Sequence, residues 1–336
     1  MTEIFAALIC RPPRHSYTLT DLGPARFRMD GKLYSRTDFQ LYNKRGLRIE
    51  CSHYRAGPNE FDEYEASPCV VYLHGNCGSR VDADEIVEGL LEEGVSVFSL
   101  DFSGCGLSDG DLVSLGYFEQ DDLSCVLEYL ANDPSTTSVA IWGRSMGAVV
   151  ALLVAGSEQF KGISCLILDS PYSSLQQLLE QLAHKYIPQV PLLPYEKVVE
   201  AALLSLRQAV RQKANYDLFD VETTSPASRC RMPALFAHAK DDQLIPASHS
   251  KLLMEAYAGE KELLELDGDH NSARESEFLK KVSSYLVRNL SSSSPLSIEK
   301  SRKEVEKRAL EPQHSQDPVS WFSSFVGGLF QTETAR

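Results

Sequence analysis

Apolar strands alternate with helical segments along the first half of the chain. Runs with the composition of buried strands lie at 69–75, the first part of 95–110, 138–142 and 162–171. Segments with helical spacing of apolar residues lie between them, at 80–94, 117–132 and 145–156. Strands that are apolar throughout are buried on both faces, and successive parallel strands need a crossover connection. The alternation therefore predicts an α/β fold with a mostly parallel central sheet flanked by helices.

The alternation is preceded by a predicted hairpin and later interrupted by a helical insertion. Residues 36–54 alternate apolar and polar side chains around a central turn, which predicts a β-hairpin. Residues 172–230 have helical periodicity at 175–186 and 195–213 and contain no clear strand. We expect this insertion to form a helical cap over the site. The alternation then resumes with segments at 233–239, 247–258, 261–268 and 274–290.

The predicted elements divide the chain into four segments. An N-terminal segment spans 1–29 and the α/β domain spans 30–290. Four consecutive serines then begin a charged, serine-rich linker at 291–312, and residues 313–336 form a tail. The length of 336 residues is sufficient for one large α/β domain with such tails.

Composition narrows the functional classes and the cellular location. The formal net charge of −14 argues against nucleic acid as a partner, because phosphates require a Lys/Arg-rich surface. The eight cysteines have no paired spacing, which indicates reduced, cytoplasmic usage and no zinc site. The N-terminus lacks the basic region and cleavage site of a signal peptide, and no run of 18 apolar residues occurs. We therefore expect a cytoplasmic protein without a metal or another cofactor.

The stretch Gly143-Arg144-Ser145-Met146-Gly147 lies between the predicted strand at 138–142 and the helix that follows. A Gly-x-Ser-x-Gly turn in this context is a nucleophile elbow, in which the flanking glycines permit a close approach of the backbone. It would present the Ser145 hydroxyl at the N-terminus of a helix, where negative charge is stabilised. A plain tight turn is the alternative, and the downstream residues decide against it.

A serine hydroxyl needs a base and an orienting acid to become a nucleophile. In this architecture the order along the chain is serine, acid, histidine. His270 follows the last predicted strand and is the expected base. Asp242 follows the strand before it and is the expected acid, with Asp241 capping the next turn. Asp241 and Asp169 remain alternative acids.

Stabilising a tetrahedral oxyanion requires two N–H groups directed at one point. The residue after the nucleophile, Met146, is expected to supply one backbone amide. Asn76, in the loop His74-Gly75-Asn76, is expected to supply the other. Gly75 permits close approach, and we expect His74 to brace the loop.

These residues together resemble the α/β-hydrolase superfamily. The resemblance covers residues 30–290 and is strongest to its serine-aminopeptidase-type, lysophospholipase-like branch, including depalmitoylating hydrolases and uncharacterised plant and protist hydrolases. The segments that carry it are YLHGN (72–76), LDFSGCGLSDG (100–110), GRSMGA (143–148), LDSPY (168–172), HAKDDQLIP (238–246) and DGDHN (267–271). It implies Ser145, Asp242 and His270 as a catalytic triad. Ala239 departs from the pattern, because many relatives have glycine there.

The expected function is hydrolysis of a carboxylic ester or thioester through an acyl-enzyme. Apolar residues and prolines in the cap favour a lipophilic acyl group on a small-molecule or lipid substrate. A peptidase acting near a free N-terminus is one alternative. It would need an acidic cluster in the cap, where Glu180, Glu196 and Glu200 are scattered along the sequence. A non-catalytic interaction scaffold is the other.

The tail contains a further apolar feature within 321–331. Six residues recur on one helical face: Trp321, Phe322, Phe325, Val326, Leu329 and Phe330. An aromatic face of this size is expected to be covered. It would dock on its own domain, lie on a membrane surface, or bind a protein partner whose identity the sequence does not give. The second alternative would make the protein peripherally membrane-associated.

Overall fold

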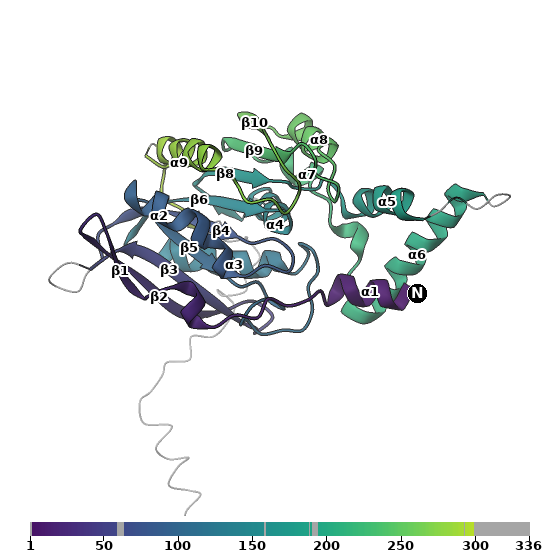
Figure 1. Cartoon of the computed structure of the whole chain (residues 1–336), viewed down its shortest axis with the longest axis horizontal. Coiled ribbons are helices and arrows are strands. Elements are labelled where there is room, and N and C mark those ends of the chain that lie inside the picture. Colours follow the sequence, from purple (N-terminus) through teal and green to yellow (C-terminus); the bar gives the residue numbers. More distant parts are fainter. Residues whose placement is uncertain are drawn as a thin grey trace, which may run out of the picture. The chain divides into compact units, whose positions relative to one another are not determined.

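A mixed sheet runs through the protein (Figure 1), whose computed structural model describes residues 2–58, 64–157, 159–187, 189, 194–291 and 293–298. Nine of the described strands form this sheet in the order β1-β2-β3-β5-β4-β6-β8-β9-β10. They are β1 (Arg26–Met29), β2 (Lys32–Tyr42), β3 (Arg48–Ala56), β4 (Ser67–Leu73), β5 (Ser96–Leu100), β6 (Thr136–Arg144), β8 (Ile163–Asp169), β9 (Ala234–Ala239) and β10 (Lys261–Leu266). From β5 to β10 all neighbouring strands are parallel, whereas β1, β2 and β3 pair antiparallel. The predicted α/β fold with a mostly parallel sheet is confirmed.

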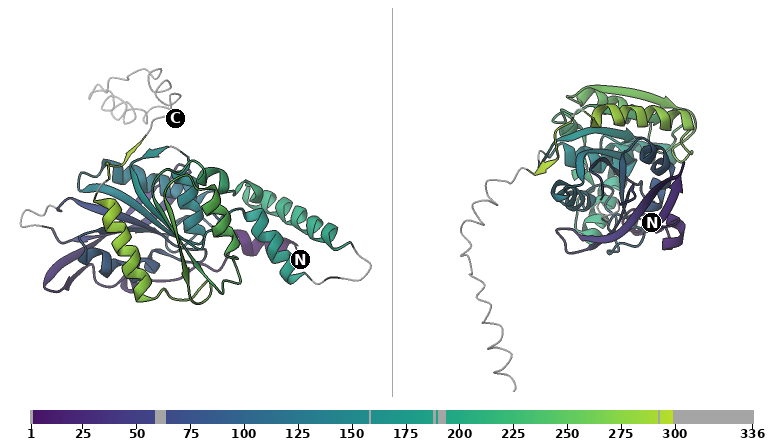
Figure 2. Two further views of the ribbon diagram at one scale, coloured as in Figure 1. Left: turned by 90° about the horizontal axis from the view of Figure 1, so that it is seen from above. Right: turned by 90° about the vertical axis from the view of Figure 1, so that its left-hand side faces the viewer.

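Helices cover both faces of the sheet (Figure 2). One face packs against α3 (Glu119–Asn132), α4 (Met146–Ala155) and α8 (Ser248–Ala256). The other packs against α2 (Asp84–Glu92), which follows the short helix η2 (Arg80–Ala83), and α9 (Ser276–Leu290). In β4, Val71 and Leu73 face the first layer, while Val70 and Tyr72 face the second. Successive side chains of a strand point to opposite faces, so both of its sides are buried, as its apolar sequence predicts.

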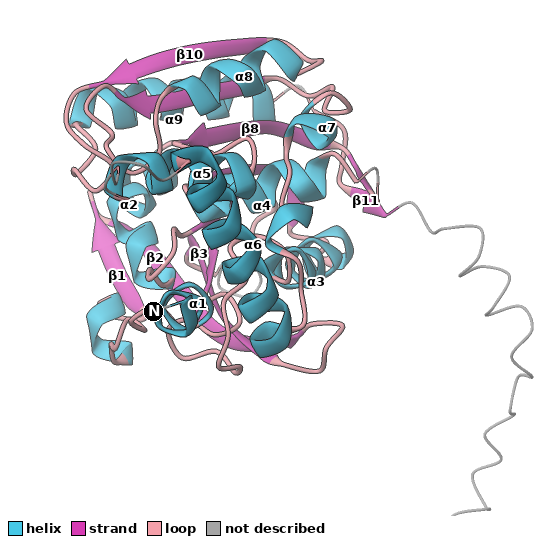
Figure 3. Cartoon of the chain, turned by 90° about the vertical axis from the view of Figure 1, so that its right-hand side faces the viewer, coloured by secondary structure: helices cyan, strands magenta, loops and turns pink. Residues whose placement is uncertain are grey.

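The helical insertion forms a cap at the carboxyl end of β8 (Figure 3). Its helices are α5 (Leu175–Tyr186), α6 (Tyr195–Ala214) and the short η3 (Leu218–Asp220). The cap was expected to extend to residue 230, but in the structure its last helix is η3, and the next helix belongs to the main domain. The helix α7 (Thr224–Ala227) packs against α4, since Ala227 lies in the main core and the Pro226 carbonyl sits where a Cβ on Gly156 would lie.

Both ends of the described chain differ from the expected boundaries. The sheet begins at Arg26, because β1 pairs with β2 around a turn at Asp30–Gly31, so a boundary at residue 30 would cut a hairpin. Ahead of it, α1 (Thr2–Cys10) packs beside α6, and η1 (Leu19–Leu22) follows. Beyond α9, β11 (Ser297–Ile298) pairs with β7 (Phe160–Lys161). The tail at 313–336 lies outside the described residues.

None of the helices in the described ranges is both long enough and apolar enough to span a bilayer. The eight cysteines, all of which fall within those ranges, are free thiols.

Candidate active site

Ser145 occupies a strained turn between β6 and α4. Its backbone has φ 53° and ψ −116°, a conformation that L-residues rarely adopt. Its N–H donates to the Asp169 carbonyl at 2.7 Å. A Cβ on Gly147 would lie 2.2 Å from the Leu73 carbonyl oxygen, and one on Gly143 would lie 2.4 Å from Gly147. Only glycines allow α4 to begin this close to the sheet, with Ser145 at its N-terminus.

Ser145, His270 and Asp242 lie in one hydrogen-bonded chain. The Ser145 Oγ is 3.1 Å from His270 Nε2, and His270 Nδ1 is 2.6 Å from Asp242 Oδ2. Each of the three residues is at most 8% exposed. They come from the loops that follow β6, β9 and β10, and the carboxyl ends of parallel strands lie at one edge of the sheet. The structure therefore brings the three sequence-predicted residues together.

Asp242 is held as a carboxylate. Its Oδ1 accepts hydrogen bonds from the N–H groups of Leu244 (2.9 Å) and Ile245 (2.7 Å). Burial favours the neutral acid, but interactions with His238 and His270, together with the Ile245 N–H, outweigh it and lower the pKa of Asp242 well below its usual value. An ionised Asp242 accepts the Nδ1–H of His270, which leaves Nε2 of that ring free to accept a proton.

His238 supports the acid from the strand that precedes it. Its Nε2 lies 2.8 Å from the Ile245 carbonyl oxygen and 3.5 Å from Asp242 Oδ2. Because a carbonyl oxygen only accepts, Nε2 carries the proton, and Nδ1 accepts from the Ser250 hydroxyl at 2.7 Å. From the sequence, His238 is only the first residue of the segment 238–246 that contains the acid, and no supporting role is predicted for it. A histidine at the end of a predicted strand, four residues before the acid, is the signal that the sequence offers.

The two alternative acids have other environments. Asp241 is exposed, and the turn that it was expected to cap is capped by Asp242 itself. Asp169 is buried and receives two hydrogen bonds from the Arg274 guanidinium, at 2.7 and 2.8 Å. The His270 ring bonds to neither of them.

The His74–Asn76 loop fixes the direction of one backbone amide. His74 accepts the Phe102 N–H at Nε2 (3.1 Å), so its Nδ1–H donates to the Gly75 carbonyl (2.7 Å). The Gly78 N–H donates to the same carbonyl at 3.1 Å. In a planar trans peptide the N–H points opposite to the C=O, so these bonds direct the Asn76 N–H away from His74. His74 thus braces the loop.

This loop lies beside the turn that carries Ser145. A Cβ on Gly75 would be 3.5 Å from the Ser145 Cβ. Met146 is the first residue of α4, and the first N–H groups of a helix have no intrahelical partner. In the described ranges, the backbone N–H groups of Asn76 and Met146 donate to no other protein group. Two amides without partners therefore flank the nucleophile turn.

A second serine–histidine pair lies at the base of the cap. The Ser173 Oγ is 2.8 Å from His249 Nδ1, and His249 Nε2 is 3.1 Å from Gln181 Oε1. Burial lowers the pKa of His249 to about 4. Its orienting partner is a neutral amide, so this pair lacks the anion that would stabilise an imidazolium.

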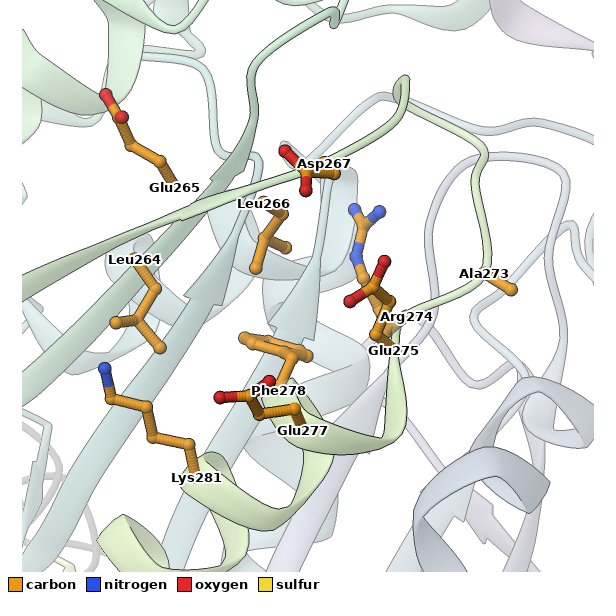
Figure 4. A pocket seen from close by; sticks show the side chains of 10 residues that line it. All are labelled: Leu264, Glu265, Leu266, Asp267, Ala273, Arg274, Glu275, Glu277, Phe278 and Lys281. Atoms are coloured by element: carbon orange, nitrogen blue, oxygen red, sulfur yellow. The ribbon is translucent and has the colours of Figure 1, made fainter.

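Two cavities lie near these elements but include none of Ser145, Asp242 and His270. One, of about 190 Å³, lies between β10 and α9 and includes Arg274 and Phe278 (Figure 4). The other, of about 380 Å³, lies between α5 and α6. Its lining residues are Gln176, Glu180, His184, Glu196, Val199, Glu200, Leu203, Leu204 and Phe219. The three glutamates that are scattered in the sequence thus share one cleft. Within the described ranges, no cluster of three or more His, Cys, Asp or Glu residues is placed to hold a metal ion.

Known proteins resemble this chain over most of the domain. A 205-residue region is 32% identical to the uncharacterized protein YqkD of Bacillus subtilis, covering 60% of this chain and 64% of that protein. A 246-residue region is 23% identical to the lysophosphatidylserine lipase ABHD12 of Danio rerio. It covers 67% of this chain and 60% of that protein. The chain thus spans less than two thirds of the length of either relative.

The fold also matches solved structures. The esterase Pf2001 of Pyrococcus furiosus superposes with a TM-score of 0.61 at 21% identity, covering 83% of this chain and all of that one. The sequence model of the family described as serine aminopeptidase, S33 (Hydrolase_4) matches residues 64–269, more than half of the chain. The protein therefore belongs to the serine aminopeptidase S33 family and has the α/β-hydrolase fold.

Proposed function

We propose that the protein is a serine hydrolase that cleaves a carboxylic ester or thioester through an acyl-enzyme. The observation that carries the proposal is the buried series of hydrogen bonds from the Ser145 hydroxyl through the His270 ring to the Asp242 carboxylate. A serine beside a histidine whose other nitrogen donates to an ionised carboxylate is the arrangement that activates a hydroxyl. Family membership and the esterase-like fold support the same assignment.

In the proposed reaction, His270 Nε2 takes the Ser145 proton as Oγ attacks the acyl carbon. The amides of Asn76 and Met146 stabilise the oxyanion, and the N-terminal end of α4 adds a favourable field. His270 then gives the proton to the leaving alkoxide or thiolate, and the acyl-enzyme forms. Water attacks this ester, with His270 as the base, and releases the acid and free Ser145. Asp242 stabilises the imidazolium in both halves.

We propose that the acyl group is lipophilic and that the substrate is a small molecule or a lipid. The cap supplies apolar side chains, including Val199, Leu203 and Phe219, along the cleft between α5 and α6. One relative is named as a lysophosphatidylserine lipase, which supports a lipid ester.

An aminopeptidase-type reaction is the second candidate. The cleft between α5 and α6 gathers Glu180, Glu196 and Glu200, which the sequence alone leaves scattered. Carboxylates grouped in this way can bind the α-amino group of a peptide substrate. The same nucleophile, base and acid would serve both reactions.

Ser145→Ala is expected to abolish covalent labelling by a fluorophosphonate probe, because the probe reacts with an activated serine. Labelling is read by in-gel fluorescence. Ser173→Ala is the matched control: it removes the hydroxyl of the other serine–histidine pair and should leave labelling unchanged. Labelling that persists in Ser145→Ala, or folded wild-type protein that is not labelled, contradicts the proposal.

Asp242→Asn is expected to lower kcat/KM by about 10³–10⁴-fold, because an amide neither fixes the His270 tautomer nor stabilises the imidazolium. Steady-state kinetics with a p-nitrophenyl ester measures the loss. Asp241→Asn removes the same charge one residue away, on an exposed side chain, and should retain wild-type activity. Equal losses in the two variants would show that Asp242 has no special role.

A series of p-nitrophenyl acyl esters from acetate to octanoate is expected to give rising kcat/KM. Each methylene that becomes buried contributes about 0.8 kcal/mol, or up to about fourfold. A preference for acetate would contradict the lipophilic acyl group. If aminoacyl p-nitroanilides are turned over faster than the esters, and Glu180→Gln reduces that turnover, the peptidase is favoured instead. If the folded protein turns over neither kind of substrate, a non-catalytic scaffold is favoured.

We also propose that the apolar face at 321–331, which lies outside the described residues, binds a membrane surface. The full chain is then expected to co-sediment with phosphatidylcholine liposomes, whereas a chain lacking residues 313–336 should stay in the supernatant. Replacing Phe325 and Phe330 by serine should reproduce the loss at full length. Equal pelleting of the full and truncated chains would overturn this proposal.

A further inference from the structure

Arg144 links the nucleophile turn to the loop that carries His270. It is the last residue of β6 and directly precedes Ser145. Its Nη2 donates to the backbone carbonyl of His270 at 3.2 Å and to that of Ser272 at 3.0 Å. Two carbonyls of the loop, two residues apart, are therefore bonded to one guanidinium.

The first residues of this loop are attached to the loop after β9, because the Asp241 N–H donates to the Gly268 carbonyl at 3.1 Å and Lys240 Nζ donates to Asp267 Oδ1 at 3.0 Å. Between β10 and α9, most residues are exposed or half-buried, and only His270 and Arg274 are buried. Within the loop, Asp269 Oδ1 accepts from the N–H groups of Asn271 and Ser272, which shapes a local turn but does not attach it to the domain. Beyond Gly268, the backbone of the loop is attached through contacts with the ends of β6 and β8.

Arg274 supplies the second anchor. Its Nη1 donates to the Ser272 carbonyl at 3.0 Å, the same oxygen that Arg144 binds. Arg274 is fixed in turn by its buried, two-fold hydrogen bond with Asp169 at the end of β8. Figure 4 shows Arg274 on the loop that leads from Asp267 through Ala273 to α9. The loop is thus bound at the ends of two adjacent strands, directly by Arg144 of β6 and, through the side chain of its own Arg274, by Asp169 of β8.

The guanidinium of Arg144 is itself held in place from the other side. Its Nη1 lies 3.9 Å from Glu85 Oε1, which also accepts the Tyr72 hydroxyl at 3.3 Å. Glu85 belongs to α2 and Tyr72 to β4, so both supports are parts of the core. A side chain with several rotatable bonds is restricted to one arrangement by these partners.

We propose that Arg144 is a positioning residue for His270, an inference that rests on the proposed hydrolase function. Ser145 and Arg144 are neighbours in a rigid turn, so the bond from Arg144 to the His270 carbonyl sets the distance between the base and the nucleophile. Among the residues that the structure describes, the hydrogen-bond partners of the ring are Ser145 and Asp242. A displacement of about 1 Å in such a contact lowers catalytic rates by about 10²-fold.

The test compares Arg144→Met, Arg144→Lys and Arg229→Met in p-nitrophenyl ester hydrolysis. Arg144→Met is expected to lower kcat about 10- to 100-fold with KM unchanged within about twofold. Arg144→Lys should recover most of the loss, since an ammonium can donate to both carbonyls. Arg229→Met is the matched control, because Arg229 also donates to a backbone carbonyl, that of Gly156, far along the chain from these loops.

A double-mutant comparison separates positioning from general stability. In a His270→Ala background, Arg144→Met should leave the residual rate unchanged, because Arg144 acts through His270. The same fold loss in both backgrounds, or wild-type kcat in Arg144→Met, would overturn the role. If Arg144→Met does not fold, Arg144→Gln at this partly exposed position carries the same comparison. Wild-type protein inert to both ester and fluorophosphonate would overturn the proposed function and this role with it, whereas an active wild type with an unaffected variant overturns the role alone.

Discussion

The left-handed backbone of Ser145 is the constraint on which the rest of the site depends. A non-glycine residue in such a conformation costs of the order of 1–3 kcal/mol, so the surrounding structure must over-determine it. Here the N–H of Ser145 is bonded to β8 through Asp169, and α4 starts so close to β4 that Gly147 has no room for a Cβ. The same closeness brings the His74–Asn76 loop beside the hydroxyl. The turn thus fixes the nucleophile, the helix end and the loop amide together.

The two serine–histidine pairs show what a hydrogen bond alone does not provide. Ser173 is closer to its histidine than Ser145 is, at 2.8 Å against 3.1 Å. The difference lies in the third residue. His249 faces the amide of Gln181 and is buried enough that its pKa falls to about 4, so it is a weak base. His270 faces an ionised Asp242, which stabilises the cation that forms when a proton is taken. The charge of the orienting group is therefore the difference that favours Ser145 over Ser173 as the proposed nucleophile.

Sequence reasoning predicts this architecture well wherever periodicity or chain order carries the information. The cap helices fall at 175–186 and 195–214, within one residue of expectation, because their apolar spacing is regular. The first hairpin strand, β1, was missed although Asp30–Gly31 is a typical hairpin turn, since only four residues precede it in the strand. The early end of the cap was missed because α7 is a short helix whose packing partner, α4, is distant in sequence.

Within the site, sequence order places Ser145, the acid loop and His270, but contacts made only in the fold assign the remaining roles. The choice between Asp241 and Asp242 depends on which carboxylate faces inward, and here one side chain both caps its own turn and receives His270. The variable residue of the Gly-x-Ser-x-Gly pattern carries no signal by itself. Arg144 gains a role only because the loop after β10 returns to the end of β6.

The backbone and the side chain of Asp169 have separate roles at the site. As a carboxylate after a strand it resembles a possible acid, yet its carbonyl accepts the Ser145 N–H while its carboxylate holds Arg274. Arg274 and Arg144 meet at the Ser272 carbonyl. The bonds therefore form a closed circuit from the nucleophile turn through Asp169 and Arg274 to the loop of His270, and back through Arg144. In a circuit of this kind, Ser145 and His270 keep their separation even though the loop of His270 is largely exposed, because that loop is tied to the adjacent ends of β6 and β8.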